Sequence, residues 1–75
     1  MPLITVKAIE GVFSAEQKQE IVKGITDAMV RVEGENLRQV TWVVIEEVKS
    51  GDWAIGGNTL TTQAVKALAA GTAAG

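Results

Sequence analysis

The sequence predicts an α+β fold: a single β-α-β unit with parallel strands, followed by a short C-terminal hairpin arm. Three segments indicate this fold. Residues 3–9 and 39–48 are rich in β-branched and other apolar residues, as strands are, and residues 14–34 between them carry apolar residues at helical spacing. Strands that are joined by a helical crossover run parallel, so we expect these two strands to pair in one parallel sheet.

The length and composition of the chain allow one small domain. Its 75 residues leave no room for a second domain, and a content of 47% hydrophobic and 21% charged residues is typical of a chain that folds. We expect a single domain over residues 1–75, with its core at 2–57 and a partly disordered C-terminal extension at 58–75.

The residue types that the chain lacks exclude several kinds of chemistry. The sequence contains no cysteine, histidine or tyrosine, which excludes disulfides, thiolate nucleophiles, zinc–sulfur sites and a Ser-His-Asp triad. A net charge of −2 provides no basic stripe for phosphates, so we expect neither nucleic-acid binding nor membrane binding. The first residues lack the basic and apolar regions of a signal peptide, and we expect a cytoplasmic protein.

The first strand and the helix have clear ends. The strand, Leu-Ile-Thr-Val-Lys-Ala-Ile at residues 3–9, is followed by Glu-Gly. Ser14 and Gln17 have the spacing of a capping box, which predicts a helix start, and Gly34 is predicted to end the helix in a left-handed conformation. On the solvated side we expect an ion pair between Asp27 and Arg31. The apolar residues that predict the buried side are Ile21, Val22, Ile25, Met29 and Val32.

The second strand is predicted at residues 39–48 and is apolar on both faces for most of its length. Glu46 and Glu47 are interpreted as a strand end that emerges into water. Residues 49–52 are predicted as a turn and residues 53–57, Trp-Ala-Ile-Gly-Gly, as the start of a hairpin arm. Beyond it, residues 59–70 are interpreted as a weak helix or a frayed extension, and residues 71–75 as disordered.

A single helix can cover only one face of a two-stranded sheet. Trp42, Val44 and Val40 are expected on one face, with Val43 and Ile45 on the other. Chains below about 70–80 residues usually need disulfides, metals or partners to be stable, and this chain has no cysteine. We therefore predict a homo-oligomer.

Pro2 is the strongest candidate for a catalytic residue in the sequence. It is the only proline and follows Met1 directly at the head of the first strand. Removal of Met1 would leave a secondary amine; an α-amine titrates at about pH 8, and apolar surroundings lower its pKa, so it could act as a general base. With Met1 attached, the Pro2 nitrogen is an amide without a basic lone pair. Alternatively, a proline at this position only begins an edge strand.

Four features of the sequence carry a resemblance to a known family. They are Pro2 at the head of a strand, Glu10-Gly11 at its end, the helix start Ser-Ala-Glu-Gln-Lys at residues 14–18, and the arm Trp-Ala-Ile-Gly-Gly at residues 53–57. In these features, roughly over residues 2–57, the chain resembles the tautomerase superfamily, specifically its short 4-oxalocrotonate tautomerase group.

The resemblance implies a fold, an assembly and an activity. It implies a tautomerase-like β-α-β subunit that pairs into a dimer as the building block and assembles as a hexamer. It also implies that the amino-terminal proline, here Pro2, is the catalytic general acid–base. This proline would tautomerise a small-molecule 2-hydroxydienoate or 2-ketoacid-type substrate without a metal or cofactor. The family's aromatic pocket residue falls on Trp53, which would help to keep the pKa of the proline low.

The chain departs from the family at two arginines that hold the substrate carboxylates. The matching positions are Val12 or Phe13, after one extra loop residue, and Trp42. With Trp53 they imply a more apolar substrate pocket, suited to a less charged enol or an aromatic 2-ketoacid. Arg38 is a candidate to replace the missing cations, and a solvated surface charge is the alternative interpretation.

Two alternatives to an isomerase stay open. One is a proline-dependent hydratase or dehalogenase of the same superfamily, whose relatives also generally need arginines. The other is a non-catalytic oligomer that binds a hydrophobic ligand or a protein through its tryptophans. In the latter case, proton-transfer activity would not change in Pro2→Ala.

Overall fold

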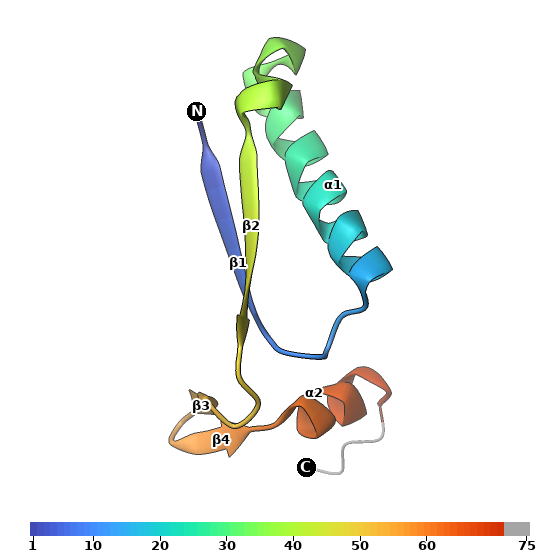
Figure 1. The fold of residues 1–75 in the computed structure, drawn as a ribbon, viewed down its shortest axis with the longest axis vertical. Helices are drawn as coiled ribbons and strands as arrows, with labels where there is room; N and C mark the ends of the chain where they lie inside the picture. Colours follow the sequence, from blue (N-terminus) through green and yellow to red (C-terminus); the bar gives the residue numbers. More distant parts are fainter. Residues whose placement is uncertain (72–75) are drawn as a thin grey trace. The chain divides into compact units, whose positions relative to one another are not determined.

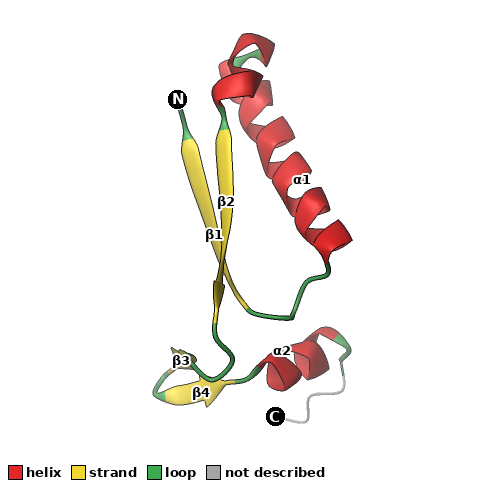
Figure 2. Ribbon diagram, viewed as in Figure 1, coloured by secondary structure: helices red, strands yellow, loops and turns green. Residues whose placement is uncertain are grey.

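The computed structural model describes residues 1–71 and confirms the β-α-β unit and the hairpin arm (Figures 1 and 2). The elements in chain order are β1 (Leu3–Ile9), α1 (Ala15–Glu33), the 3-10 helix η1 (Glu35–Val40), β2 (Trp42–Val48), β3 (Trp53–Ile55), β4 (Asn58–Leu60) and α2 (Thr62–Ala69). The chain divides into two compact units. Unit 1 comprises Met1–Val6 and Phe13–Glu46, and unit 2 comprises Lys7–Val12 and the chain from Glu47 onward.

Strands β1 and β2 form a two-stranded sheet. At one end, the Trp42 N–H donates a hydrogen bond to the Pro2 carbonyl oxygen at 3.0 Å; at the other end, the Glu10 N–H donates to the Val48 carbonyl oxygen at 2.8 Å. The two starts are therefore paired with each other, as are the two ends, so the strands run in the same direction. Figure 1 shows α1 alongside the strands and running opposite to them, as a crossover helix must.

Helix α1 begins and ends where its local sequence predicts. The Ser14 hydroxyl accepts a hydrogen bond from the Gln17 N–H at 3.1 Å, and the Gln17 side-chain oxygen accepts one from the Ser14 N–H at 2.8 Å. This reciprocal pair is the predicted capping box. At the other end, Gly34 donates its N–H to the Val30 carbonyl oxygen at 2.8 Å. It ends the helix as predicted, but its φ of 101° and ψ of 153° are not the predicted left-handed helical conformation.

The prediction that the second strand begins at Gln39 was wrong. Residues 35–40 form η1, and β2 begins at Trp42. The 3-10 turn is closed by the Thr41 N–H, which donates to the Arg38 carbonyl oxygen at 3.2 Å, and by the Thr41 hydroxyl, which donates to the Leu37 carbonyl oxygen at 2.8 Å. Val40 therefore does not share a strand face with Trp42, and the β-branched Val40 and Thr41 gave a misleading strand signal.

The two faces of the sheet differ in exposure. Side chains alternate between partly covered and exposed along β1 and along most of β2, and Val43 and Ile45 lie on the partly covered face. The opposite face is open: Leu3 is 61% exposed, Trp42 56% and Val44 40%. Among residues 1–71, only two hydrophobic side chains are buried, Ile9 and Val30. The chain therefore covers little apolar surface with its own core.

Unit 2 contains the hairpin arm and the second helix (Figure 2). Strands β3 and β4 pair antiparallel, with Trp53 opposite Leu60. Gly56 and Gly57 connect them with φ values of 59° and 83°, and a two-residue hairpin turn of type I′ needs this left-handed backbone at both positions. Residues 62–69 form α2, which Thr61 caps by accepting the Ala64 N–H at 3.1 Å. The predicted disorder at 71–75 falls almost wholly outside the described residues.

Candidate active site

Pro2 lies directly before β1, and its carbonyl oxygen is held by the Trp42 N–H. The Pro2 side chain is partly exposed, whereas Met1 is 81% exposed. Because β1 and β2 are parallel, the start of β2 lies beside Pro2. The structure therefore brings two of the predicted site residues together, Pro2 and Trp42, at one edge of the sheet in unit 1.

Trp42 stands on the open face of the sheet. Leu3 and Val44 are on the same face, by alternation along their strands, and all three side chains are at least 40% exposed. This apolar patch begins at the edge of the sheet where Pro2 lies.

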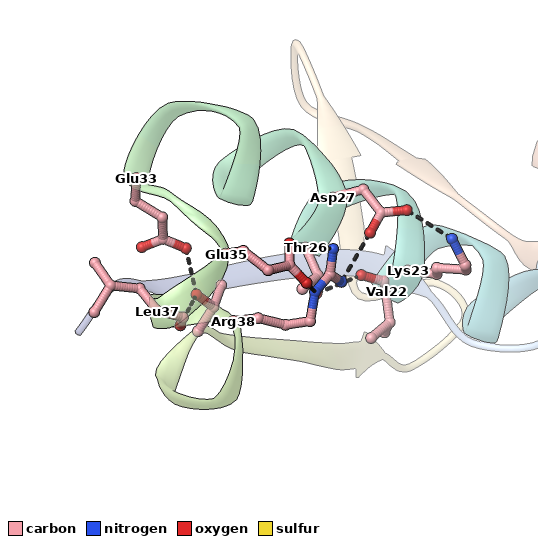
Figure 3. A network of polar contacts seen from close by, with 9 residues as sticks. Val22, Lys23, Thr26, Asp27, Glu33, Glu35, Leu37 and Arg38 are labelled. Carbon is pink, nitrogen blue, oxygen red and sulfur yellow. Dashed lines mark hydrogen bonds and ion pairs between the residues drawn. The ribbon is translucent and has the colours of Figure 1, made fainter.

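Arg38 belongs to η1, and its guanidinium binds two carboxylates (Figure 3). Arg38 Nε donates to Glu35 Oε1 at 2.8 Å, and Arg38 Nη1 donates to Asp27 Oδ1 at 2.8 Å. The hydrogen bonds that Arg38 donates to Glu35 and then to Asp27 raise the pKa of Arg38 above its ordinary value. The charge of Arg38 is therefore already engaged within unit 1.

Asp27 has different partners from the one that the sequence predicts. Its carboxylate accepts from Lys23 Nζ at 2.7 Å and from Arg38, so the predicted pair with Arg31 was wrong. The hydrogen bonds from Lys23 and then from Arg38 lower the pKa of Asp27. Lys23 is four residues before Asp27, on the same side of α1, and Arg38 reaches Asp27 because η1 folds back after the helix.

Phe13 lies at the opposite end of unit 1 from Pro2. It precedes Ser14, the N-cap of α1, and the start of α1 is far from the N-terminus of the chain in Figure 1. Phe13 lines a shallow hollow of about 280 Å³ together with Gln17, Glu20 and Ile21. The seven residues of β1, which span about 23 Å, lie between the two positions along the chain. Within one chain, Pro2 and Phe13 do not form a single pocket.

The other two predicted site residues, Val12 and Trp53, belong to unit 2. Val12 closes a turn after β1 by donating its N–H to the Ile9 carbonyl oxygen at 3.4 Å. Trp53 begins β3 and is partly exposed opposite Leu60.

Glu47 has a role that the sequence did not indicate. Its Oε2 atom accepts a hydrogen bond from the Gly11 N–H at 3.2 Å, although the two residues are 36 positions apart. The interpretation of Glu47 as a solvated strand end was therefore incomplete. A tight turn after β1 and a carboxylate at the end of a parallel β2 are the features that could have suggested the contact.

In residues 1–71, no three acidic side chains come together as metal ligands would. In the same part of the chain, no helix has the length and apolar character needed to cross a membrane.

A family model described as Tautomerase enzyme matches residues 2–63. The chain belongs to the tautomerase family. Two curated tautomerases of bacteria are similar to it. Probable tautomerase K2 of Dickeya dadantii is 34% identical over 61 residues, which cover 81% of this chain and 90% of the relative. A probable tautomerase of Staphylococcus aureus is 42% identical over 57 residues, which cover 76% and 90%.

Solved structures of tautomerase relatives share the fold. The crystal structure of DmpI from Helicobacter pylori has a TM-score of 0.67 and 35% sequence identity, and the match covers 77% of this chain and 88% of that one. A 4-oxalocrotonate tautomerase homologue has a TM-score of 0.69 and 30% identity, with coverage of 84% and 94%. Together, these matches support a tautomerase-type function.

Proposed function

We propose that this tautomerase is an isomerase that moves a proton in a 2-hydroxydienoate or 2-ketoacid-type substrate, with Pro2 as the general acid–base after removal of Met1. The observation that carries the proposal is the position of Pro2. The match to the family begins at this residue, and its carbonyl oxygen is fixed to β2 at the edge of the sheet. Its ring nitrogen would become a chain-terminal secondary amine when Met1 is removed.

Such an amine can carry out the whole proton transfer. The neutral amine accepts the proton of the enol oxygen, and the resulting ammonium donates a proton to the carbon at the far end of the enol C=C bond. The C=C bond becomes a single bond while the C–O bond becomes a carbonyl. No atom is gained or lost and no electron passes to another molecule, so the reaction needs no redox cofactor.

We propose that the substrate contacts the apolar side chains of Trp42, Trp53, Val12 and Phe13 in the assembled protein. Trp42 is the member beside Pro2, and its ring offers a large apolar surface to a substrate. Among the predicted site residues, Arg38 has the least support for a contact with substrate. A substrate carboxylate would have to displace Glu35 or Asp27 from its ion pair with the guanidinium. A substrate with one carboxylate and an aromatic or apolar group fits this set better than a dicarboxylate.

We further propose that copies of the chain associate, with a dimer as the building block and a hexamer as the assembly. The open face of the sheet supports this proposal, because Leu3, Trp42 and Val44 leave an apolar surface that the chain itself does not cover. Phe13 and Pro2 lie at opposite ends of unit 1, so a pocket that includes both would need more than one chain.

The test of the activity combines an intact mass with an enzyme assay. The rate of enol-to-keto conversion of phenylpyruvate is measured for the wild type, for Pro2→Ala and for a chain with a short N-terminal extension that keeps Pro2 inside a peptide bond. We expect Met1 to be absent from the wild type and the rate to fall by about 100-fold or more in both altered proteins. A rate that does not depend on Pro2 would instead favour a non-catalytic binding protein.

A further inference from the structure

A tight turn follows β1 and leads to Val12. The Val12 N–H donates to the Ile9 carbonyl oxygen, and Gly11, the third residue of the turn, has a φ of 76°. A positive φ at the third position is the mark of a type II turn and explains why glycine occupies it. Type I and type II turns differ mainly in the orientation of the central peptide group, which here joins Glu10 to Gly11.

Both polar groups of this central peptide are held by side chains from later segments. Its N–H, on Gly11, donates to Glu47 Oε2 at 3.2 Å, and its carbonyl oxygen, on Glu10, accepts from Thr62 Oγ1 at 2.6 Å. Glu47 lies near the end of β2, and Thr62 is the first residue of α2. All of these residues belong to unit 2.

The groups that hold the peptide are themselves fixed. The Thr62 N–H donates to the Ser50 hydroxyl at 2.9 Å, and the Ser50 N–H donates to the Glu10 carboxylate at 3.2 Å. Thr62 also packs against the turn, since a Cβ atom on Gly11 would lie 3.2 Å from Thr62 Cγ2. A flip of the central peptide would therefore break two hydrogen bonds and bring its carbonyl oxygen toward a carboxylate.

We propose that Glu47 and Thr62 are positioning residues that hold the Glu10–Gly11 peptide in one orientation and thereby fix the direction in which Val12 leaves the turn. The inference rests on the proposed function, in which Val12 contacts the substrate. Neither Glu47 nor Thr62 is itself placed in the pocket. Their effect on the reaction passes through the turn.

The test of Glu47 has a spectroscopic and a kinetic arm, and the neighbouring Glu46→Ala is the matched control. In Glu47→Ala we expect the NMR signal of the Gly11 amide proton to move upfield and KM for the phenylpyruvate enol to rise about threefold to tenfold, with kcat within about twofold. In Glu46→Ala both should stay at the wild-type values. Glu47→Gln keeps an acceptor oxygen, so its KM should lie close to the wild-type value.

The test of Thr62 uses two substitutions that separate the effect of its hydroxyl group from that of its methyl group. Thr62→Val removes the hydroxyl and should raise KM in the same way, whereas Thr62→Ser keeps the hydroxyl and should not. Thr59→Val, on exposed β4, is the control for the change from a hydroxyl to a methyl group. Circular dichroism of each variant identifies any that fails to fold, in which case the conservative variants decide the matter.

The inference is overturned if the Gly11 signal does not respond to Glu47→Ala, or if KM in Glu47→Ala and Thr62→Val equals KM in the controls. Failure of the proposed function is a different result. It would be seen by comparing the wild type with Pro2→Ala, whose rates of enol-to-keto conversion would then be equal.

Discussion

Arg38 Nη1 lies 2.8 Å from Asp27 Oδ1 and so ties η1 to the middle of α1. Glu35 binds the same guanidinium from within η1 (Figure 3). Arg38 was the candidate to replace the missing arginines of the family. It instead stabilises the connection between α1 and β2.

Substitution of Arg38 should therefore affect the fold more than the affinity for substrate. We expect Arg38→Ala to change KM for the phenylpyruvate enol by less than about threefold, because the guanidinium is already paired. The melting temperature should fall by a small amount. A rise in KM of about tenfold or more would place Arg38 on the substrate carboxylate instead.

Asp27 should make the stability of the protein sensitive to acid. Its pKa is lowered in the folded protein, so its contribution is complete above the ordinary value of 3.8 and is lost as the pH falls through the lowered pKa. In urea unfolding below that value, the free energy of unfolding should fall more steeply with pH for the wild type than for Asp27→Asn.

Gly24 is a helical position at which alanine would make the folded protein more stable than glycine does. It lies inside α1, is exposed, and a Cβ atom there would meet nothing within 4 Å. Gly24→Ala should therefore raise the free energy of unfolding by about 0.5–1 kcal/mol, since alanine loses less backbone entropy in a helix. Gly57→Ala makes the same chemical change at a positive φ and should lower the melting temperature.

The open sheet face can be tested through the mass of the particle in solution. Trp42→Asp places a charge in the exposed apolar patch and should reduce the mass observed by sedimentation. Val32→Asp is the matched control. The prediction that Val32 lies on the buried side of the helix was wrong, because its side chain is 86% exposed on α1. Equal masses for wild type and both variants would contradict the proposal that this face joins copies of the chain.

The parts of the fold that depend on neighbours in sequence could be predicted. The capping box of Ser14 and Gln17 and the turn at Gly56-Gly57 are local, so the ends of α1 and the presence of the hairpin followed from a few residues each. The start of β2 could not be predicted, because Val40 and Thr41 have the composition of a strand. Contacts that Thr41 makes with Arg38 and Leu37 override this local preference.

The sequence allowed individual residues of the candidate site to be identified, but not which of them lie together in the fold. Pro2 was identified by its place at the head of the chain, and the apolar positions by their place in the family pattern. Which of them lie together depends on pairing between β1 and β2, which brings Trp42 to Pro2 but leaves Phe13 at the other end of unit 1. The contact of Glu47 with Gly11 spans 36 residues and leaves no local signal.

The small number of buried side chains links the folding of this protein to its concentration. With Ile9 and Val30 as the buried hydrophobic residues of the described chain, a lone copy gains little free energy from its own interior. If copies of the chain associate as proposed, association supplies part of the folding free energy, and mass action governs it. Dilution would favour unfolded single chains, so the amount of protein that a cell makes would set how much of it is folded and active.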